Sequence, residues 1–230
     1  MVSRNAGRAA HGFVLLAVAA LGGPPAGAQQ EVESDGPYFH RPARAVYPPQ
    51  VGEFRRSKVY RYDPEGKDVS ASYDLATPEG RLLITVYIYP AAAIVGAALQ
   101  ESGGTAARAR LCGEEFGAVK AAISRQHGDA APIDEGEALA LPGSEPGLRH
   151  RAVYNFRSPF DGREQELRSE AHLYCYVGGD WLVKYRVSAP AAVESRKAVE
   201  AFLRAGPWPG RPSPDTVARL GPARPGAAAD

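Results

Sequence analysis

The sequence lacks the motifs that mark most common enzyme and cofactor classes. It holds two cysteines in 230 residues and no Cys-x-x-Cys pair, which argues against a redox-active thiol pair. It has no His-Glu-x-x-His metal motif and no glycine loop that would cradle a phosphate, and Ser144, in Pro142-Gly143-Ser144-Glu145-Pro146, lacks the flanking glycine spacing of a nucleophile elbow. We therefore expect no metal, no cofactor and no catalytic centre built from a local motif.

An excess of charge of one sign is also missing. The chain has 27 basic and 26 acidic residues, for a formal net charge of +1. A nearly neutral protein lacks the electrostatic field that makes binding to nucleic acids or anionic membranes the default expectation. The basic and aromatic residues around Lys58 and Tyr60 could grip a phosphate backbone, but such residues more often protect an edge strand from pairing with another chain. We expect no nucleic-acid partner.

Long apolar runs are absent as well. The run from Gly12 to Leu21 has about half of the roughly 20 residues that a membrane-spanning helix needs. Two arginines precede it, and the small residues Ala26-Gly27-Ala28 follow it. This order of features predicts that residues 1–28 form a secretory signal peptide, that the mature protein begins at Gln29, and that no membrane span remains after cleavage. We expect a periplasmic or secreted protein.

Proline-rich segments flank the part of the mature chain that can fold. Residues 29–49 are polar and proline-studded, which predicts a flexible lead-in. Residues 206–230 alternate proline with glycine, alanine and arginine, a composition that buries too little apolar surface to offset chain ordering. We expect this tail to be disordered. Folding then falls to residues 50–205, which are enough for a single domain with one core.

Six segments of residues 50–205 carry β-branched and aromatic residues at the two-residue period of strands. They are Ser57–Tyr62, Asp68–Leu75, Arg81–Tyr89, Leu148–Arg157, Glu164–Val177 and Asp180–Ser188. Short turns rich in glycine and proline separate several of them, which favours antiparallel pairing. The third segment is largely apolar on both faces, so we expect a layer on each side of the sheet.

Two helices are predicted to supply these layers. Residues 105–126 place Cys112, Phe116, Val119 and Ile123 on one face, at spacings of four, three and four. Residues 191–204 follow a proline and turn Val199, Phe202 and Leu203 inward. The expected fold class is therefore α+β, with a largely antiparallel sheet of about six strands and helices on both faces.

Two stretches of sequence resemble a known family. Val86-Tyr87-Ile88-Tyr89-Pro90 and Asp180-Trp181-Leu182-Val183-Lys184-Tyr185-Arg186-Val187-Ser188-Ala189-Pro190, which leads into the last helix, resemble PsbP-like α/β/α sandwich domains and exported bacterial proteins of similar pattern. The resemblance covers roughly residues 46–205. It implies a protein that acts by binding other proteins rather than by catalysis. No site residue of the family maps onto this chain.

The two cysteines are predicted to point at the core. Cys112 begins the buried stripe of the first helix, and Cys175 shares a strand face with Leu173 and Val177. An exported protein folds in an oxidising compartment, where an even number of cysteines suggests a disulfide. The alternative is a pair of separate buried thiols that act as small hydrophobic residues.

Two groups of strand residues are candidate sites. Tyr174, Tyr176 and His172 are predicted to share a face, and they form a partner surface if the last helix leaves that face open. The alternative is that the helix buries them. His150 and His172 are predicted to approach each other across the sheet, near Glu164 or Glu170, where they would bind zinc or transfer protons. The alternative is that both are ordinary strand histidines.

The expected function is that of a non-catalytic binding or assembly module in the cell envelope, whose partner is an unidentified protein or small ligand. The alternative is a hydrolase-type enzyme whose site is assembled in space from His150, His172 and nearby carboxylates. A cleft that holds these groups within hydrogen-bonding distance would favour the enzyme.

Overall fold

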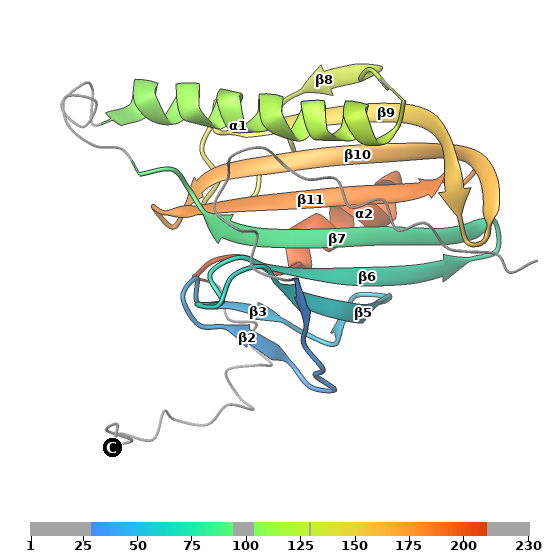
Figure 1. The fold of residues 1–230 in the computed structure, drawn as a ribbon, viewed down its shortest axis with the longest axis horizontal. Coiled ribbons are helices and arrows are strands. Elements are labelled where there is room, and N and C mark those ends of the chain that lie inside the picture. The colour runs from blue at the N-terminus through green and yellow to red at the C-terminus, as the bar shows by residue number, and fades with distance from the viewer. Residues whose placement is uncertain (1–28, 94–103, 129, 211–230) are drawn as a thin grey trace, which may run out of the picture.

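A computed structural model describes residues 29–93, 104–128 and 130–210 (Figure 1). The predicted signal peptide, residues 1–28, lies outside the described residues, as do residues 211–230 of the predicted tail. Within the described residues the fold is α+β, with a nine-stranded antiparallel sheet, a separate two-stranded sheet and two helices. The expected class is correct, and the sheet is larger than the six strands expected.

The main sheet has the strand order β1-β5-β6-β7-β11-β10-β9-β8, and β4 also pairs with β5. All the pairings are antiparallel. The strands are β1 (Gln30–Glu31), β4 (Gln50–Val51), β5 (Phe54–Arg61), β6 (Val69–Thr77), β7 (Gly80–Pro90), β8 (Asp134–Gly136), β9 (Arg149–Phe160), β10 (Arg163–Val177) and β11 (Trp181–Pro190). The six longest correspond to the six predicted segments, and the three additional strands have only two or three residues.

Strand β7 lies in the interior of the sheet, between β6 and β11. Its alternate residues Leu82, Ile84, Val86 and Ile88 are completely buried on one face. Their neighbours on the other face, such as Tyr87 and Tyr89, are only half-buried. Because successive strand residues point to opposite faces, this difference means that the two sides of the sheet are covered to different extents.

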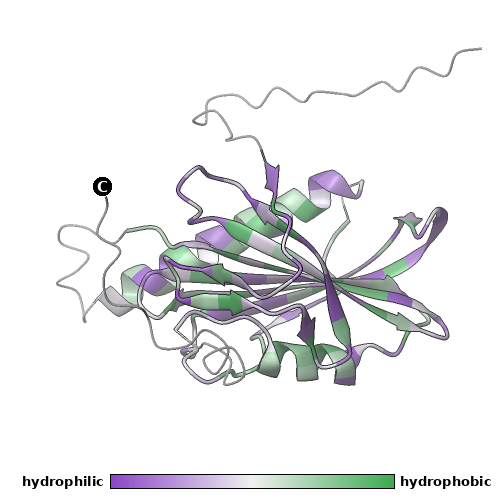
Figure 2. Ribbon diagram, turned by 90° about the horizontal axis from the view of Figure 1, so that it is seen from below, coloured by the Kyte–Doolittle hydropathy of each residue, from purple (hydrophilic) through white to green (hydrophobic). Residues whose placement is uncertain are grey.

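The helices α1 (Thr105–Gln126) and α2 (Arg196–Ala205) pack on opposite faces of the sheet, as expected. Phe116 and Ile123 of α1 belong to one hydrophobic cluster, whereas Val199, Phe202 and Leu203 of α2 belong to the other. In Figure 1 α1 crosses in front of the sheet and α2 lies behind it, and Figure 2 shows the sheet between them. None of the helices within the described ranges is long and apolar enough to cross a membrane.

Helix α2 begins later than the predicted residue 191. The backbone N–H of Ala191 still bonds to the carbonyl of Glu166, as though the strand continued, and Val193 N–H then closes a turn onto the carbonyl of Pro190. Helical structure starts only at Arg196. A proline at the end of a strand therefore leads into a turn before the helix, and that turn leaves one end of the sheet uncovered.

Residues 29–49, the expected flexible lead-in, carry β1 and the hairpin of β2 (Tyr38–His40) and β3 (Ala45–Tyr47). Tyr47 is completely buried, and its hydroxyl donates a hydrogen bond to the carbonyl of Val69 at 3.1 Å. His40 is also buried, with its ring 5.3 Å from that of Trp181. Large buried side chains and the pairing of β1 with β5, rather than a periodic pattern, thus attach this segment to the sheet.

The expected tail likewise begins with packed residues. Trp208 is buried, with its ring centroid 5.2 Å from that of Tyr174. The carbonyl of Pro207 accepts a hydrogen bond from the Tyr185 hydroxyl at 2.9 Å. Residues 206–210 therefore cover part of the sheet next to α2.

A disulfide between Cys112 and Cys175 joins α1 to β10, and the two Cα atoms are 5.8 Å apart. The prediction that both cysteines face a common core is confirmed, because both lie in the cluster under α1. Neither remains a separate buried thiol.

Candidate functional site

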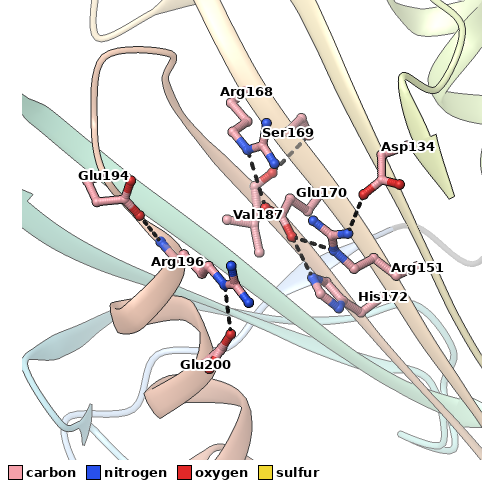
Figure 3. Close-up of polar contacts among 10 residues, drawn as sticks. All are labelled: Asp134, Arg151, Arg168, Ser169, Glu170, His172, Val187, Glu194, Arg196 and Glu200. Carbon is pink, nitrogen blue, oxygen red and sulfur yellow. Dashed lines mark hydrogen bonds and ion pairs between the residues drawn. The ribbon is translucent and has the colours of Figure 1, made fainter. Parts of the chain in front are cut away.

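A cleft of about 670 Å³ lies where the turn before α2 leaves the sheet uncovered. Strands β8, β9 and β10 form one wall, and the turn and first residues of α2 form the other (Figure 3). Its polar lining consists of Asp134, Arg151, Arg168, Glu170, His172, Glu194, Ser195, Arg196 and Glu200. The cleft is therefore lined by side chains of both charge signs.

Strand geometry places the residues of the sheet wall. Arg168, Glu170 and His172 are alternate residues of β10, so they point to the same face. Arg151 of β9 is the direct cross-strand neighbour of His172. Side chains at such positions lie within reach of one another, so two adjacent strands are enough to assemble the group.

Glu170 is at the centre of this group and is only 8% exposed. Its Oε2 accepts hydrogen bonds from Arg151 Nε at 3.0 Å and from His172 Nε2 at 3.1 Å, while Arg168 Nε lies 3.5 Å from Oε1. Burial acts to raise the pKa of the Glu170 carboxyl, but the hydrogen bonds from His172 and Arg151 outweigh it and lower this pKa to about 2. The carboxylate is therefore ionised at neutral pH and holds both partners in place.

His172 has one ring nitrogen engaged and one free. It is buried, its Nε2 contacts Glu170, and its Nδ1 has no hydrogen-bond partner among the described residues. A buried polar atom without a partner carries an energetic cost, and a bound molecule can remove that cost. His172 thus has one hydrogen-bonding position that the described residues leave unfilled.

The opposite wall carries a solvent-exposed pair. Arg196 Nε lies 3.1 Å from Glu200 Oε1, and the backbone N–H of Arg196 donates to Glu194 at 3.2 Å. The Arg196 side chain is 83% exposed. Ion pairs in such positions contribute little to stability, so these side chains are free to rearrange around a ligand.

The structure does not form the expected partner surface of Tyr174, Tyr176 and His172. Tyr174 is completely buried against Trp208. Tyr176 has a positive φ of 56° at an irregularity between Tyr174 and Val177, and it packs in the cluster under α1. A bulge adds one residue and turns the following side chain to the other face, so only His172 of the three lines the cleft.

The expected pairing of His150 with His172 is wrong. His150 lies opposite Leu173, one position away from the Arg151–His172 pair, so it points to the other face of the sheet. Its ring stacks on Phe116 of α1, with 5.1 Å between centroids. Glu164 is exposed near the far end of β10, opposite Pro159, so Glu170 is the carboxylate that contacts His172.

Sequence reasoning did not identify Arg151 and Arg168 as site residues. The available signal was the alternation of charged and small residues in Arg168-Ser169-Glu170-Ala171-His172, just before the apolar end of the strand, because a buried charge at such a position needs a partner of opposite charge. Within the described ranges, no group of three or more His, Cys, Asp or Glu side chains is arranged to hold a metal ion.

Comparisons with known proteins leave the site to be interpreted from its own geometry. No protein-family model and no curated protein sequence matches the chain. Among solved structures, the chain is similar to LpqN, involved in cell envelope biogenesis of Mycobacterium tuberculosis. The identity is 10%, the match covers 79% of this chain and 92% of that chain, and the TM-score is 0.28. A TM-score this low supports no inference about function.

Proposed function

We propose that this protein is an exported, non-catalytic binding or assembly module, and that its cleft holds a short charged segment of a partner protein of the cell envelope. The observation that carries the proposal is the cleft between β8–β10 and α2, which presents both charge signs around a buried and rigidly held carboxylate. The disulfide is consistent with folding in an oxidising compartment, and the signal-peptide pattern and the PsbP-like resemblance support the same assignment.

The groups left free in the cleft suit a peptide. Arg168 is 39% exposed, and among the described residues its guanidinium meets only Glu170, at 3.5 Å. It can donate to a carboxylate or a backbone carbonyl of the partner. His172 Nδ1 can accept a backbone N–H, and Glu200 and Arg196 at the rim can pair with side chains of either sign. A segment with mixed charges would satisfy all four residues.

Affinity capture with matched variants tests this proposal. The tagged protein from Gln29 onward, with its disulfide intact, is incubated with a cell-envelope extract of the source cells, and the retained proteins are identified by mass spectrometry. Arg168→Glu reverses a charge inside the cleft. The control Arg157→Glu reverses a charge on β9 at an exposed position that pairs only with Glu166.

A protein retained by the original sequence and by Arg157→Glu, and lost with Arg168→Glu, is the expected result. Capture of the same proteins by all three, or of none by any, would contradict the proposal. Loss of binding must also occur without a change in melting temperature, since a misfolded variant would lose its partner for a trivial reason.

A hydrolase-type enzyme is the second candidate, and one observation favours it. The contact of 3.1 Å between Glu170 and His172 orients an imidazole whose second nitrogen is free, as a general base requires. Turnover of a generic ester or phosphate substrate that disappears in His172→Gln, but persists in His150→Gln on the other face, would establish this function instead.

A further inference from the structure

The face of the sheet that carries α1 is only partly covered by the helix. The cluster under α1 includes Ala152 and Tyr154 of β9 and Leu173 of β10. Across β5, β6, β7 and β11 the same face bears rings, hydroxyls and charges, and many of these side chains are half-buried. This is a region of the sheet with its own side-chain chemistry, separate from the cleft beside α2.

Two rows of cross-strand neighbours define this region. In the first row Lys184 of β11 faces Tyr87 of β7, and Tyr87 faces Ser70 of β6. In the second row, two residues further along β11, Arg186 faces Thr85, which in turn faces Ser72. Directly paired residues share a face, so two basic side chains stand side by side next to tyrosine and hydroxyl groups.

A pocket of about 250 Å³ opens at one end of these rows. The rings of Tyr62 and Tyr87 lie 6.3 Å apart, and Lys184 Nζ lies 4.3 Å from the centroid of Tyr87. Glu115 reaches in from α1 and accepts a hydrogen bond from the Tyr89 hydroxyl at 2.8 Å. The pocket is lined by Tyr62, Asp68, Tyr87, Tyr89, Glu115 and Lys184. Its volume is close to the lower limit of about 300 Å³ for ligand sites, which suits one ring rather than a large ligand.

Arg186 lacks the partner that a half-buried guanidinium normally has. It makes no hydrogen bond or ion pair with any described residue, and its Nε is buried without a partner. Burial lowers the pKa of Arg186, although Tyr87 and Tyr154 act in the opposite direction. Withdrawing a charge from water without pairing it is costly, so an anion is the ligand that this position favours.

Lys184 points to the same conclusion. It contacts the faces of Tyr87 and Tyr89 but makes no ion pair within the described part of the chain. Its ammonium therefore remains able to pair with an anionic group that arrives next to Arg186.

We propose that Tyr62, Tyr87, Tyr89, Lys184 and Arg186, which we call the tyrosine face, bind an acidic oligosaccharide. One sugar ring occupies the pocket, where its C–H groups pack on the negative faces of the tyrosine rings and its hydroxyls donate to Asp68 and Glu115. A carboxylate of the same sugar chain pairs with the guanidinium of Arg186 through two parallel hydrogen bonds.

Single-stranded nucleic acid fits this face less well, although it too combines stacking with negative charge. Its affinity depends on many simultaneous phosphate contacts, and of the residues of the tyrosine face only Lys184 and Arg186 are basic.

Isothermal titration with defined probes tests the proposal. The probes are tetragalacturonate, which carries a carboxylate on every ring, the neutral maltotetraose, and a ten-residue oligothymidylate. Tetragalacturonate is expected to bind at least about tenfold more tightly than maltotetraose, since a charge-assisted hydrogen-bond pair is worth at least about a factor of ten in affinity. Arg186→Gln is expected to remove this preference.

Three variants make the outcome specific. Arg186→Lys keeps the charge but not the paired donors and should retain part of the preference. Tyr62→Ala removes one ring and should weaken both sugars alike, which gives a second test if Arg186→Gln does not fold. Arg157→Gln, at an exposed position of β9, should change nothing. Absence of tetragalacturonate binding, equal binding by Arg186→Gln, or tighter binding of the oligothymidylate would each overturn the proposal.

Discussion

The two faces of the sheet are held to their helices by different interactions. On the α2 face, Phe202 lies edge-on to Phe54 and Tyr73, at centroid distances of 4.9 Å and 5.1 Å, within a continuous apolar cluster. On the α1 face, a smaller cluster is joined to the helix by the Cys112–Cys175 disulfide, and the rest of the face carries polar groups. Packing therefore holds α2, whereas packing and a covalent bond together hold α1.

This difference shows where ligand-binding groups can be placed. The cleft beside α2 and the tyrosine face both lie where helical cover ends, one at the turn before α2 and the other beside α1. Under the helices the sheet is apolar and stabilises the fold. Beyond them it carries Arg168 and His172 on one face and Lys184 and Arg186 on the other.

The largest effect on stability is expected from removing the central ring of the α2 face, that of Phe202. Phe202 is 1% exposed. Phe202→Ala leaves a cavity between Phe54, Tyr73 and Tyr185, and it is expected to lower the free energy of unfolding by about 3–5 kcal/mol. Urea denaturation followed by tyrosine and tryptophan fluorescence measures the change.

Phe116→Ala is the matched change on the α1 face. Phe116 stacks on His150 at the edge of the smaller cluster, and the disulfide still holds α1 against β10. We expect a smaller loss than for Phe202→Ala. Equal losses in the free energy of unfolding would show that the two faces contribute alike to stability.

Removal of the disulfide is the second test, with an expected loss of about 2–4 kcal/mol. Cys112→Ala combined with Cys175→Ala avoids a buried hydroxyl and leaves two small apolar residues. The unfolded chain gains the freedom of the loop between two residues separated by 63 positions. Limited proteolysis should then cut near α1 before it cuts α2, and identical cleavage patterns with and without the bridge would contradict a special role for it.

The elements that sequence patterns predicted are those with long periodic segments. The helix expected over residues 105–126 has these same bounds in the structure, because Cys112, Phe116, Val119 and Ile123 make an unbroken apolar stripe. The central strand and the common core of the two cysteines follow from the same kind of alternation. Each pattern is local and repeats, so it can be recognised without knowledge of the fold.

The elements that escaped prediction depend on single contacts. Strands β1, β4 and β8 have two or three residues and show no period. Large buried side chains help to attach the segments before and after the main strands, such as Tyr47 and His40 in the first and Trp208 in the second. No periodic pattern in their own segments indicates that such a residue will be buried, because its binding cavity is made by residues distant in the sequence.

The candidate site was only partly predictable for a related reason. A one-residue difference in register separates His150 from His172, and a bulge separates Tyr176 from Tyr174. Both shifts reverse the face on which a side chain lies, and neither can be recognised from the alternation of residue types in the sequence. His172 was identified from the sequence. Its cross-strand neighbour Arg151 can be recognised only once the pairing of β9 with β10 is known.

The smallest expected effect concerns Asp68, which sits on the polar part of the α1 face. Burial, and secondly the neighbouring Asp63, raise the pKa of the Asp68 carboxyl to about 6, although Lys184 acts in the opposite direction. A carboxyl whose pKa is higher in the folded protein than in the unfolded chain destabilises the fold when ionised. This penalty is absent below the unfolded value of about 4 and complete above about pH 6.

Asp68→Asn should therefore raise the melting temperature at pH 7.5 and leave it almost unchanged at pH 4. The gain should stay below about 1 kcal/mol, because the carboxyl is partly solvated. Asp180→Asn, at an exposed turn, is the matched control for the replacement of a carboxylate by an amide. A shift for Asp68→Asn that is the same at both pH values would mean that water reaches this carboxyl freely. The pocket of the tyrosine face would then be too open to enclose a sugar ring, and of the two faces only the α2 face would keep a candidate ligand site.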